Sequence, residues 1–382
     1  MFENKLVMVP GPTPVVESIR MEMGRSTVAH GDPDFVCDFR DVIRNTRELL
    51  DCNGQVFIIA GAGSLAMEMA VSNNLKAGDN LLVVSHGAFG DRFPDIASRK
   101  GINVDVLRSE WGDIVPVSLI EEKLSEKNYA AVTVSHVDTS TAVMAPIEEI
   151  GNMINDKYPD TLLIVDGVAA TAGARAYMNR MHIDVLFTAS QKAFGVAPGL
   201  AILWAGNKSL ERRKTLGTIP EYYCDYEKWL PVMDDPALYF STPPVNMVWA
   251  FKRAVEIIMD EGIEERYVRH ERQGMAMREA LKSMGFKLTA KEGREAPTLT
   301  NCMYMDGVDD ARFRSDAALE GVTLAGALGE YKGKAFRIGH MGNADDNDMI
   351  AALSSVERAL MKQNVHVDFG KGVGVYMNCM RK

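Results

Sequence analysis

The fold is decided by two stretches of the chain, Leu162-Leu163-Ile164-Val165-Asp166 and Val185-Leu186-Phe187-Thr188-Ala189-Ser190-Gln191-Lys192. Each is a short run of apolar residues that ends in polar ones, which is the pattern of a strand buried on both faces. An acid and a lysine therefore stand where two strands end. In open, mostly parallel sheets, ligands bind beyond the carboxyl ends of the strands. The two stretches thus predict both a sheet and the edge of that sheet at which a site is built.

Similar apolar runs recur through the first half of the chain, and helical patterns separate them. We predict strands over residues 55–60, 81–84, 103–107, 130–135, 162–165, 185–188 and 200–204. Helices are predicted from residue 64 and over residues 89–100 and 117–125. This alternation is typical of an α/β fold in which helices sandwich a mostly parallel sheet.

The pattern changes from about residue 245. Two long helical stretches, 245–261 and 264–284, lead into shorter strands over 298–305 and 335–338 and a last helix over 345–361. A chain of 382 residues is too long for one ordinary core. We therefore predict an N-terminal segment (1–19), a large domain (20–255) and a smaller α+β C-terminal domain (256–382). The stretch Pro10-Gly11-Pro12 is expected to be an extended loop.

Composition excludes several classes of protein. The formal net charge is -10 and no Lys/Arg-rich block occurs, which argues against a nucleic-acid partner. No apolar run is long enough to span a membrane, and the first residues lack the apolar core of a signal peptide. The five cysteines are widely spaced with no C-x-x-C, which argues against a disulfide framework and against a metal site. We expect a cytoplasmic protein.

The run Ala60-Gly61-Ala62-Gly63-Ser64 predicts a tight turn from a strand into a helix. Small residues let the backbone approach a ligand, and a helix N-terminus offers free N–H groups to a phosphate. A dinucleotide-binding turn and a turn without a ligand are the alternatives. The dinucleotide alternative expects an acid at the end of the next strand, but residues 83–86 read Val-Val-Ser-His.

Asp166 and Lys192 carry the strongest chemical signal. A carboxylate at the end of a buried strand needs a partner, and in pyridoxal-phosphate (PLP) enzymes that partner is the protonated pyridine nitrogen. A lysine among apolar neighbours loses its proton easily and can form an imine. The alternatives are an Asp that caps the next segment and an exposed loop lysine. The order of glycine turn, acid and lysine, with the lysine 26 residues (192 − 166) after the acid, favours PLP.

With Pro10-Gly11-Pro12 and Arg337-Ile338-Gly339, these motifs resemble the class V, fold-type I PLP aminotransferases of the alanine–glyoxylate and serine–pyruvate group. The resemblance implies that Lys192 holds PLP as a Schiff base and that Asp166 pairs with the pyridine nitrogen. The further roles that it implies are phosphate binding for Gly63, Ser64 and Gln191, ring stacking for Phe89, a hydroxyl near the ring oxygen for Thr139, packing under the ring for Val168, contact with the neighbouring subunit's phosphate for Tyr239 and Thr242, and substrate carboxylate binding for Arg337.

Several of these residues also fit a purely structural role. Phe89 and Tyr239 fit a core position, Thr139 fits a cap, and Arg337 fits a surface ion pair. His30 fits either the entrance to the site or a loop-ordering role, and the sequence does not decide between them. Where the family usually has Glu and Gly in the loop after residue 137, this chain has Asp138 and Ala142. Both departures are expected close to the substrate.

The resemblance implies an aminotransferase that moves the amino group of a small amino acid, of the alanine or serine type, to glyoxylate or pyruvate by a ping-pong mechanism. It also implies a homodimer with shared active sites. A 2-aminoethylphosphonate aminotransferase, a nicotinamide oxidoreductase and a non-catalytic PLP-fold binding protein are alternatives. A cysteine desulfurase would need a cysteine shortly before the substrate arginine, and residues 321–335 contain none.

Overall fold

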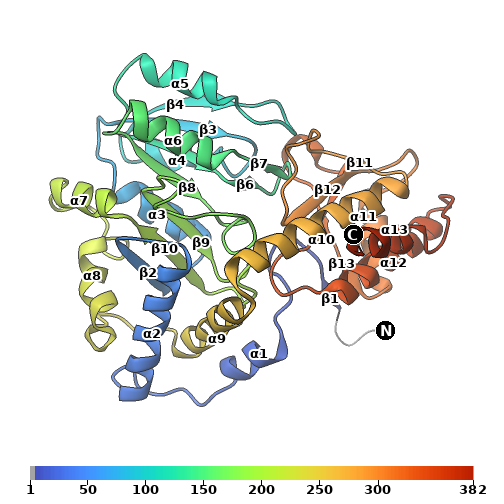
Figure 1. Ribbon diagram of the computed structural model, residues 1–382, viewed down its shortest axis with the longest axis horizontal. Helices are drawn as coiled ribbons and strands as arrows, with labels where there is room; N and C mark the ends of the chain where they lie inside the picture. Colours follow the sequence, from blue (N-terminus) through green and yellow to red (C-terminus); the bar gives the residue numbers. More distant parts are fainter. Residues whose placement is uncertain (1–4, 382) are drawn as a thin grey trace.

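The computed structural model describes residues 5–381, so Lys382 and the first four residues of the predicted N-terminal segment lie outside it. The chain forms a large unit and a smaller one, and the long helix α10 (Ile263–Ser283) runs from one to the other (Figure 1). Within residues 5–381, no helix is long and apolar enough to cross a membrane.

A seven-stranded sheet forms the centre of the large unit, in the order β2-β10-β9-β8-β5-β3-β4. Strand β10 is antiparallel to both of its neighbours, and the other pairs are parallel. The mostly parallel sheet predicted from the apolar runs is thus confirmed. The strands are β2 (Gln55–Ala60), β3 (Asn80–Ser85), β4 (Asn103–Arg108), β5 (Ala131–Ser135), β8 (Leu162–Asp166), β9 (Val185–Ala189) and β10 (Leu200–Ala205).

Helices cover both faces of this sheet (Figure 1). The strands β5, β8, β9 and β10 are buried along their whole length, which explains why they read as continuous apolar runs rather than alternating ones. The sequence did not predict α2, α6, α7 and α8. The covering helices are α2 (Pro33–Leu49), α3 (Gly63–Ser72), α4 (Arg92–Ser98), α5 (Val117–Ser125), α6 (Ile147–Lys157), α7 (Asn207–Thr215), α8 (Tyr226–Asp234) and α9 (Val245–Glu261).

The smaller unit has its own antiparallel sheet, β11-β12-β15-β14, and its own hydrophobic core. Asp345 caps α12 in a capping box with Asp348, so the helix start predicted there is confirmed. The C-terminal helix α13 packs against α10 and α12, and its buried Tyr376 donates to Asp346 (2.7 Å). The elements are β11 (Lys287–Leu288), β12 (Leu299–Met303), α11 (Asp310–Leu319), β14 (Ala325–Gly326), β15 (Ala335–Gly339), α12 (Asp346–Lys362) and α13 (Lys371–Met380).

The N-terminal segment bridges the two units. Its strand β1 (Leu6–Val7) pairs in parallel with β13 (Val322–Thr323) of the smaller unit. The Gly339 N–H then donates to the Met8 carbonyl (3.0 Å), and the Thr13 N–H donates to the Gln191 carbonyl (3.1 Å) in the large unit. The next helix, α1 (Glu17–Met23), packs on α9. The division of the chain at residue 255 remains a prediction.

Gly339 lies where the N-terminal segment crosses β15, and a Cβ added there would lie 2.3 Å from the Val9 carbonyl oxygen. We expect Gly339→Ala to lower the free energy of unfolding by about 1–3 kcal/mol, because the segment must move away. Gly374→Ala is the matched control, since nothing lies within 4 Å of its added Cβ in α13. That variant should gain about 0.5–1 kcal/mol from helix propensity. Urea unfolding curves that move in the same direction for both variants would contradict this account.

Candidate active site

The sheet brings Asp166 and Lys192 to the same edge. Asp166 is the last residue of β8, and Lys192 comes three residues after the end of the neighbouring strand β9 (189 to 192). The two side chains are close enough for the charge of each to shift the pKa of the other. The prediction that both stand at strand ends is therefore confirmed by the topology.

Asp166 is a buried acid with few partners. Its side chain accepts a hydrogen bond from the Val168 N–H (3.0 Å) and a long one from the Ser135 hydroxyl (3.4 Å). Burial raises the pKa of Asp166 to about 6. Loss of water penalises the charged form of a carboxylate, and an adjacent cation would reverse that penalty. The site is thus prepared for a positively charged partner.

The pKa of Lys192 is shifted in the opposite direction to that of Asp166. Burial, followed by the charge of Arg337, lowers the pKa of Lys192 to about 8. A larger fraction of its amine is therefore neutral, and so nucleophilic, than for an ordinary lysine. Its Nζ donates to the Pro10 carbonyl. Gly11 follows with a φ of 98°, and a Cβ there would lie 2.4 Å from Lys192 Cδ. Another residue at this position would be strained by the positive φ and would also push the lysine side chain aside.

The predicted phosphate turn opens α3, whose N-terminus has no side-chain cap. The first N–H groups of the helix are thus available to an anion. A Cβ at Gly63 would approach Val168 Cγ2 to 3.1 Å, and Ser64 is exposed beside it. The Gln191 Oε1 atom is buried and has no hydrogen-bond partner among residues 5–381. The turn and this amide each offer an unused polar group.

Asp138 holds the loop that carries Phe89. It is the second residue of β6 (Val137–Asp138), and its Oδ2 accepts from the N–H groups of Phe89 (2.9 Å) and Gly90 (3.2 Å). Its Oδ1 accepts from the N–H (2.9 Å) and the hydroxyl (2.6 Å) of Ser140. Asp138 is fully buried, and its hydrogen bonds fix the backbone of the half-buried Phe89.

Arg337 projects from β15 of the smaller unit. Its Nε donates to the Gly326 carbonyl (2.8 Å), and its Nη1 lies 3.5 Å from both the carbonyl and the hydroxyl oxygen of Thr139. The Thr139 carbonyl also accepts from Asn301 Nδ2 (3.2 Å). No carboxylate of the described chain lies within 4.0 Å of Arg337 to form the surface ion pair considered above. Half of the guanidinium thus remains available to a substrate anion.

The other predicted residues lie apart from this cluster. Tyr239 is buried in an aromatic group with Phe39 and Trp229, and its hydroxyl has no partner among the described residues. Thr242 and His30 are both exposed. Within residues 5–381, no hydrogen bond joins these three side chains to Asp166 or Lys192.

Residues 15–323 match the family described as aminotransferase class-V, so the chain belongs to the class V aminotransferases. An uncharacterised aminotransferase of Methanocaldococcus jannaschii is 35% identical over 95% of this chain and 94% of its own length. Alanine–glyoxylate aminotransferase 1 of Saccharomyces cerevisiae is 32% identical over 88% and 91%. A crystal structure of ureidoglycine–glyoxylate aminotransferase from Bacillus subtilis is similar with a TM-score of 0.95 at 25% identity, and covers 100% of this chain and 99% of its own.

The chain is thus an aminotransferase with the fold-type I architecture that the motifs predicted. Enzymes of this family depend on PLP, and the residues present fit that cofactor. Asp166 forms no ion pair within 4.0 Å among residues 5–381, the N-terminus of α3 and Gln191 Oε1 have unused capacity for hydrogen bonds, and the pKa of Lys192 is lowered. The sequence did not reveal the Pro10 carbonyl as a contact of Lys192, although a glycine between two prolines is a signal of close backbone approach.

Replacing Asp138 tests its part in the site. The two carboxylate oxygens of Asp138 accept four hydrogen bonds. An asparagine side chain has only one acceptor oxygen, so some of the buried N–H groups would lose their hydrogen-bond partner. We expect Asp138→Asn to cost about 1.5–3 kcal/mol in unfolding free energy and to slow catalysis. Asp113→Asn is the control, because Asp113 pairs with Lys291 at the surface and should matter by less than about 1 kcal/mol. Equal costs in thermal unfolding would refute the role of Asp138.

Proposed function

We propose that the chain binds PLP as a Schiff base on Lys192 and transfers an amino group from a small amino acid to glyoxylate by a ping-pong mechanism. One observation carries the proposal. A buried acid with a raised pKa and a lysine with a lowered pKa stand at the ends of adjacent strands. An aminotransferase needs this pair, because the acid stabilises a protonated pyridine and the lysine amine must give up its bond to the cofactor to the amino group of the substrate.

The chain's own residues then have distinct tasks. When bound, PLP supplies an electron sink that weakens the Cα–H bond of the amino acid. Asp166 would keep the pyridine nitrogen protonated. Once the amino acid has displaced it, Lys192 Nζ would remove the proton from Cα as general base and, as general acid, deliver it to the carbon of the cofactor to which the lysine had been bound. The Pro10 carbonyl, which already accepts from Nζ, would hold the freed amine near the reacting atoms.

The substrates follow from Arg337 and from the relatives. A guanidinium with a free half binds a carboxylate through two parallel hydrogen bonds and fixes its orientation. The names of the yeast and Bacillus relatives differ in the amino donor and share glyoxylate, which supports glyoxylate as the acceptor here. Alanine and serine are the donors that we propose, and pyruvate is a second acceptor to test. An activity assay with a panel of amino donors distinguishes alanine and serine from 2-aminoethylphosphonate, which is the alternative donor.

A desulfurase activity is disfavoured by the cysteines. The nearest cysteine before Arg337 is Cys302, which is fully buried in β12. Burial raises the pKa of the Cys302 thiol far above its usual range. The thiolate, not the thiol, is the nucleophile, so Cys302 is unsuited to that chemistry.

Borohydride reduction tests the cofactor assignment. The PLP-loaded protein should be yellow, and reduction followed by peptide mapping should find the cofactor on Lys192. Lys192→Ala should abolish turnover, since no other amine can form the Schiff base in this position. In a second experiment, each candidate amino donor is added to the unreduced protein, and the loss of its visible absorbance band is followed over time. A label on another lysine would disprove the assignment.

Arg337→Ala tests substrate binding. We expect the variant to raise KM for alanine by roughly tenfold to a hundredfold, because a charge-assisted pair is worth about 1.5–3 kcal/mol. PLP occupancy should be unchanged, since Arg337 is assigned to the substrate. Arg314→Ala is the control, as it removes an ion pair with Asp310 in the same unit. If Arg337→Ala instead loses PLP while KM stays the same, the assignment is wrong.

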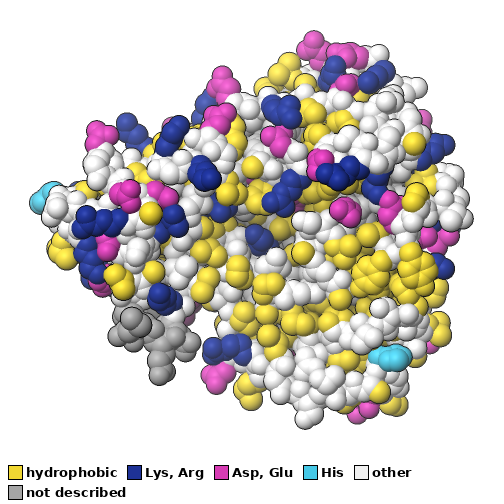
Figure 2. Space-filling view, turned by 180° about the vertical axis from the view of Figure 1, so that it is seen from behind, with side chains coloured by type: hydrophobic (Ala, Val, Ile, Leu, Met, Phe, Trp, Pro, Cys, Tyr) yellow, Lys and Arg dark blue, Asp and Glu magenta, His cyan; other side chains and the backbone are white. Residues whose placement is uncertain are grey.

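We also propose a homodimer with shared active sites. Figure 2 shows hydrophobic side chains gathered over a broad area of one face of the molecule, with few charged side chains among them. Tyr222 and Leu238, on either side of α8, are 63% and 59% exposed. Large exposed apolar areas are typical of protein interfaces. Thr242 lies just after Leu238 and is free to reach a neighbouring subunit.

A mixing experiment tests the shared sites. Thr242→Glu places a negative charge where the neighbour's phosphate is expected, so that this variant should be nearly inactive. Mixing it with the inactive Lys192→Ala chain should restore about a quarter of the wild-type activity, because about half of the dimers are mixed and each has one intact site. Activity in Thr242→Glu alone, or none after confirmed mixing, would each argue against shared sites.

A further inference from the structure

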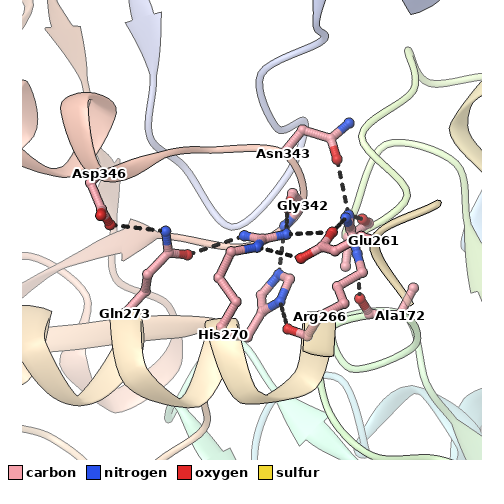
Figure 3. Close-up of polar contacts among 10 residues, drawn as sticks. Ala172, Glu261, Arg266, His270, Gln273, Gly342, Asn343 and Asp346 are labelled. Carbon is pink, nitrogen blue, oxygen red and sulfur yellow. Dashed lines mark hydrogen bonds and ion pairs between the residues drawn. The ribbon is translucent and has the colours of Figure 1, made fainter. Parts of the chain in front are cut away.

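Arg266 on α10 is a fully buried cation that has no assigned role. Its Nε donates to the Ala172 carbonyl (3.0 Å), and its Nη1 pairs with Glu261 (2.6 Å) at the end of α9. Its Nη2 donates both to the Ala193 carbonyl (2.7 Å) and to Asn343 Oδ1 (3.1 Å). Figure 3 shows these partners converging on the guanidinium from separate segments of the chain.

Three of these acceptors belong to the segments that carry the catalytic groups. Ala172 lies six residues after Asp166 (172 − 166), and Ala193 directly follows Lys192. Asn343 lies six residues after Arg337 (343 − 337). We infer that Arg266 is a positioning residue, whose single guanidinium fixes the segments of Asp166, Lys192 and Arg337 relative to one another. This inference rests on the proposed function, because it concerns the same site.

The surroundings keep the guanidinium in one place. Glu261 is shared with Arg269 (2.6 Å), so its carboxylate has two cationic partners. Burial and the charges of Arg266 and Arg269 hold the pKa of His270 well below its usual range, so its ring is neutral. The Gly342 N–H donates to His270 Nε2 (2.9 Å), and the Nδ1–H donates back to the Arg266 carbonyl (2.7 Å). The loop after β15 is therefore tied to α10 through Arg266, Arg269 and His270.

The geometry requires arginine rather than any cation. The planar guanidinium presents donors in several fixed directions at once, and here they reach carbonyl groups on two loops and an amide on a third. An ammonium group on a flexible stem keeps the charge but cannot span the same set of acceptors. A misplacement of about 1 Å, caused far from the chemistry, can cost about a hundredfold in rate. The Arg266→Lys variant should therefore keep an ion pair with Glu261 but no longer align the segments that carry Asp166, Lys192 and Arg337.

The test compares Arg266→Lys with Arg269→Lys in the PLP-loaded protein. Arg269 is the matched control, because it pairs with the same Glu261 and donates to the Gly342 carbonyl (3.0 Å) but does not touch the Lys192 segment. We expect Arg266→Lys to lower kcat by about tenfold to a hundredfold. Water entering the loosened site should also raise the pH midpoint of the visible absorbance, because hydration favours a charged nitrogen. The control should change both measurements far less than Arg266→Lys does, because the hydrogen bonds of Arg269 reach the loop after Arg337 but not the segments of Asp166 and Lys192.

Either of two results would overturn the inference: an Arg266→Lys protein that behaves like the wild type, or one whose changes are equal to those of Arg269→Lys. If Arg266→Lys does not fold, Asn343→Ala decides, since it removes only the arm toward Arg337. It should raise KM several-fold without moving the pH midpoint, and an unchanged KM would then overturn the inference. A wild-type protein that binds no PLP would instead refute the proposed function, which keeps the two failures distinct.

Discussion

The buried carboxylate of Asp166 is the constraint on which the rest of the site depends. It ends a strand that is buried along its length, and it accepts only one short hydrogen bond. A carboxylate in such surroundings is stable in its charged form only beside a cation. The parallel sheet places Lys192 at the next strand end, and the turn before α3 leaves its N–H groups free. These groups fit the roles that we propose for them, with Asp166 facing the pyridine nitrogen of PLP and the start of α3 facing its phosphate.

The lowered pKa of Lys192 depends on what encloses it. Pro10 and Gly11 cover its side chain from the N-terminal segment, while Arg337 adds a positive charge from the smaller unit. Two parts of the chain, one before the large unit and one after it, thus complete a site whose floor is the central sheet. This arrangement explains why a segment at the beginning of the sequence pairs with a strand near residue 322.

The sequence predicted the parts of the fold that leave a local pattern. Continuous apolar runs marked the buried strands, and Asp345 marked the start of α12 by its capping chemistry. The helices α2, α6, α7 and α8 of the large unit were missed, as were α11 and α13 of the smaller unit. The contacts that organise the site could not be predicted, because they join residues far apart in the chain, as Asp138 joins Phe89. Arg266 did leave a signal, since it stands four residues before His270 on the buried stripe of α10, where a charge demands partners.

The most direct test of this account is the pKa of Asp166 without and with PLP, measured by carbon NMR on aspartate-labelled protein and assigned with Asp166→Asn. Without the cofactor, the carboxyl should titrate at about pH 6, because burial opposes its charge. With PLP bound, the pKa should fall well below that value, since the protonated pyridine favours the carboxylate. A carboxyl that titrates at the same pH in both states would contradict the pairing of Asp166 with the cofactor.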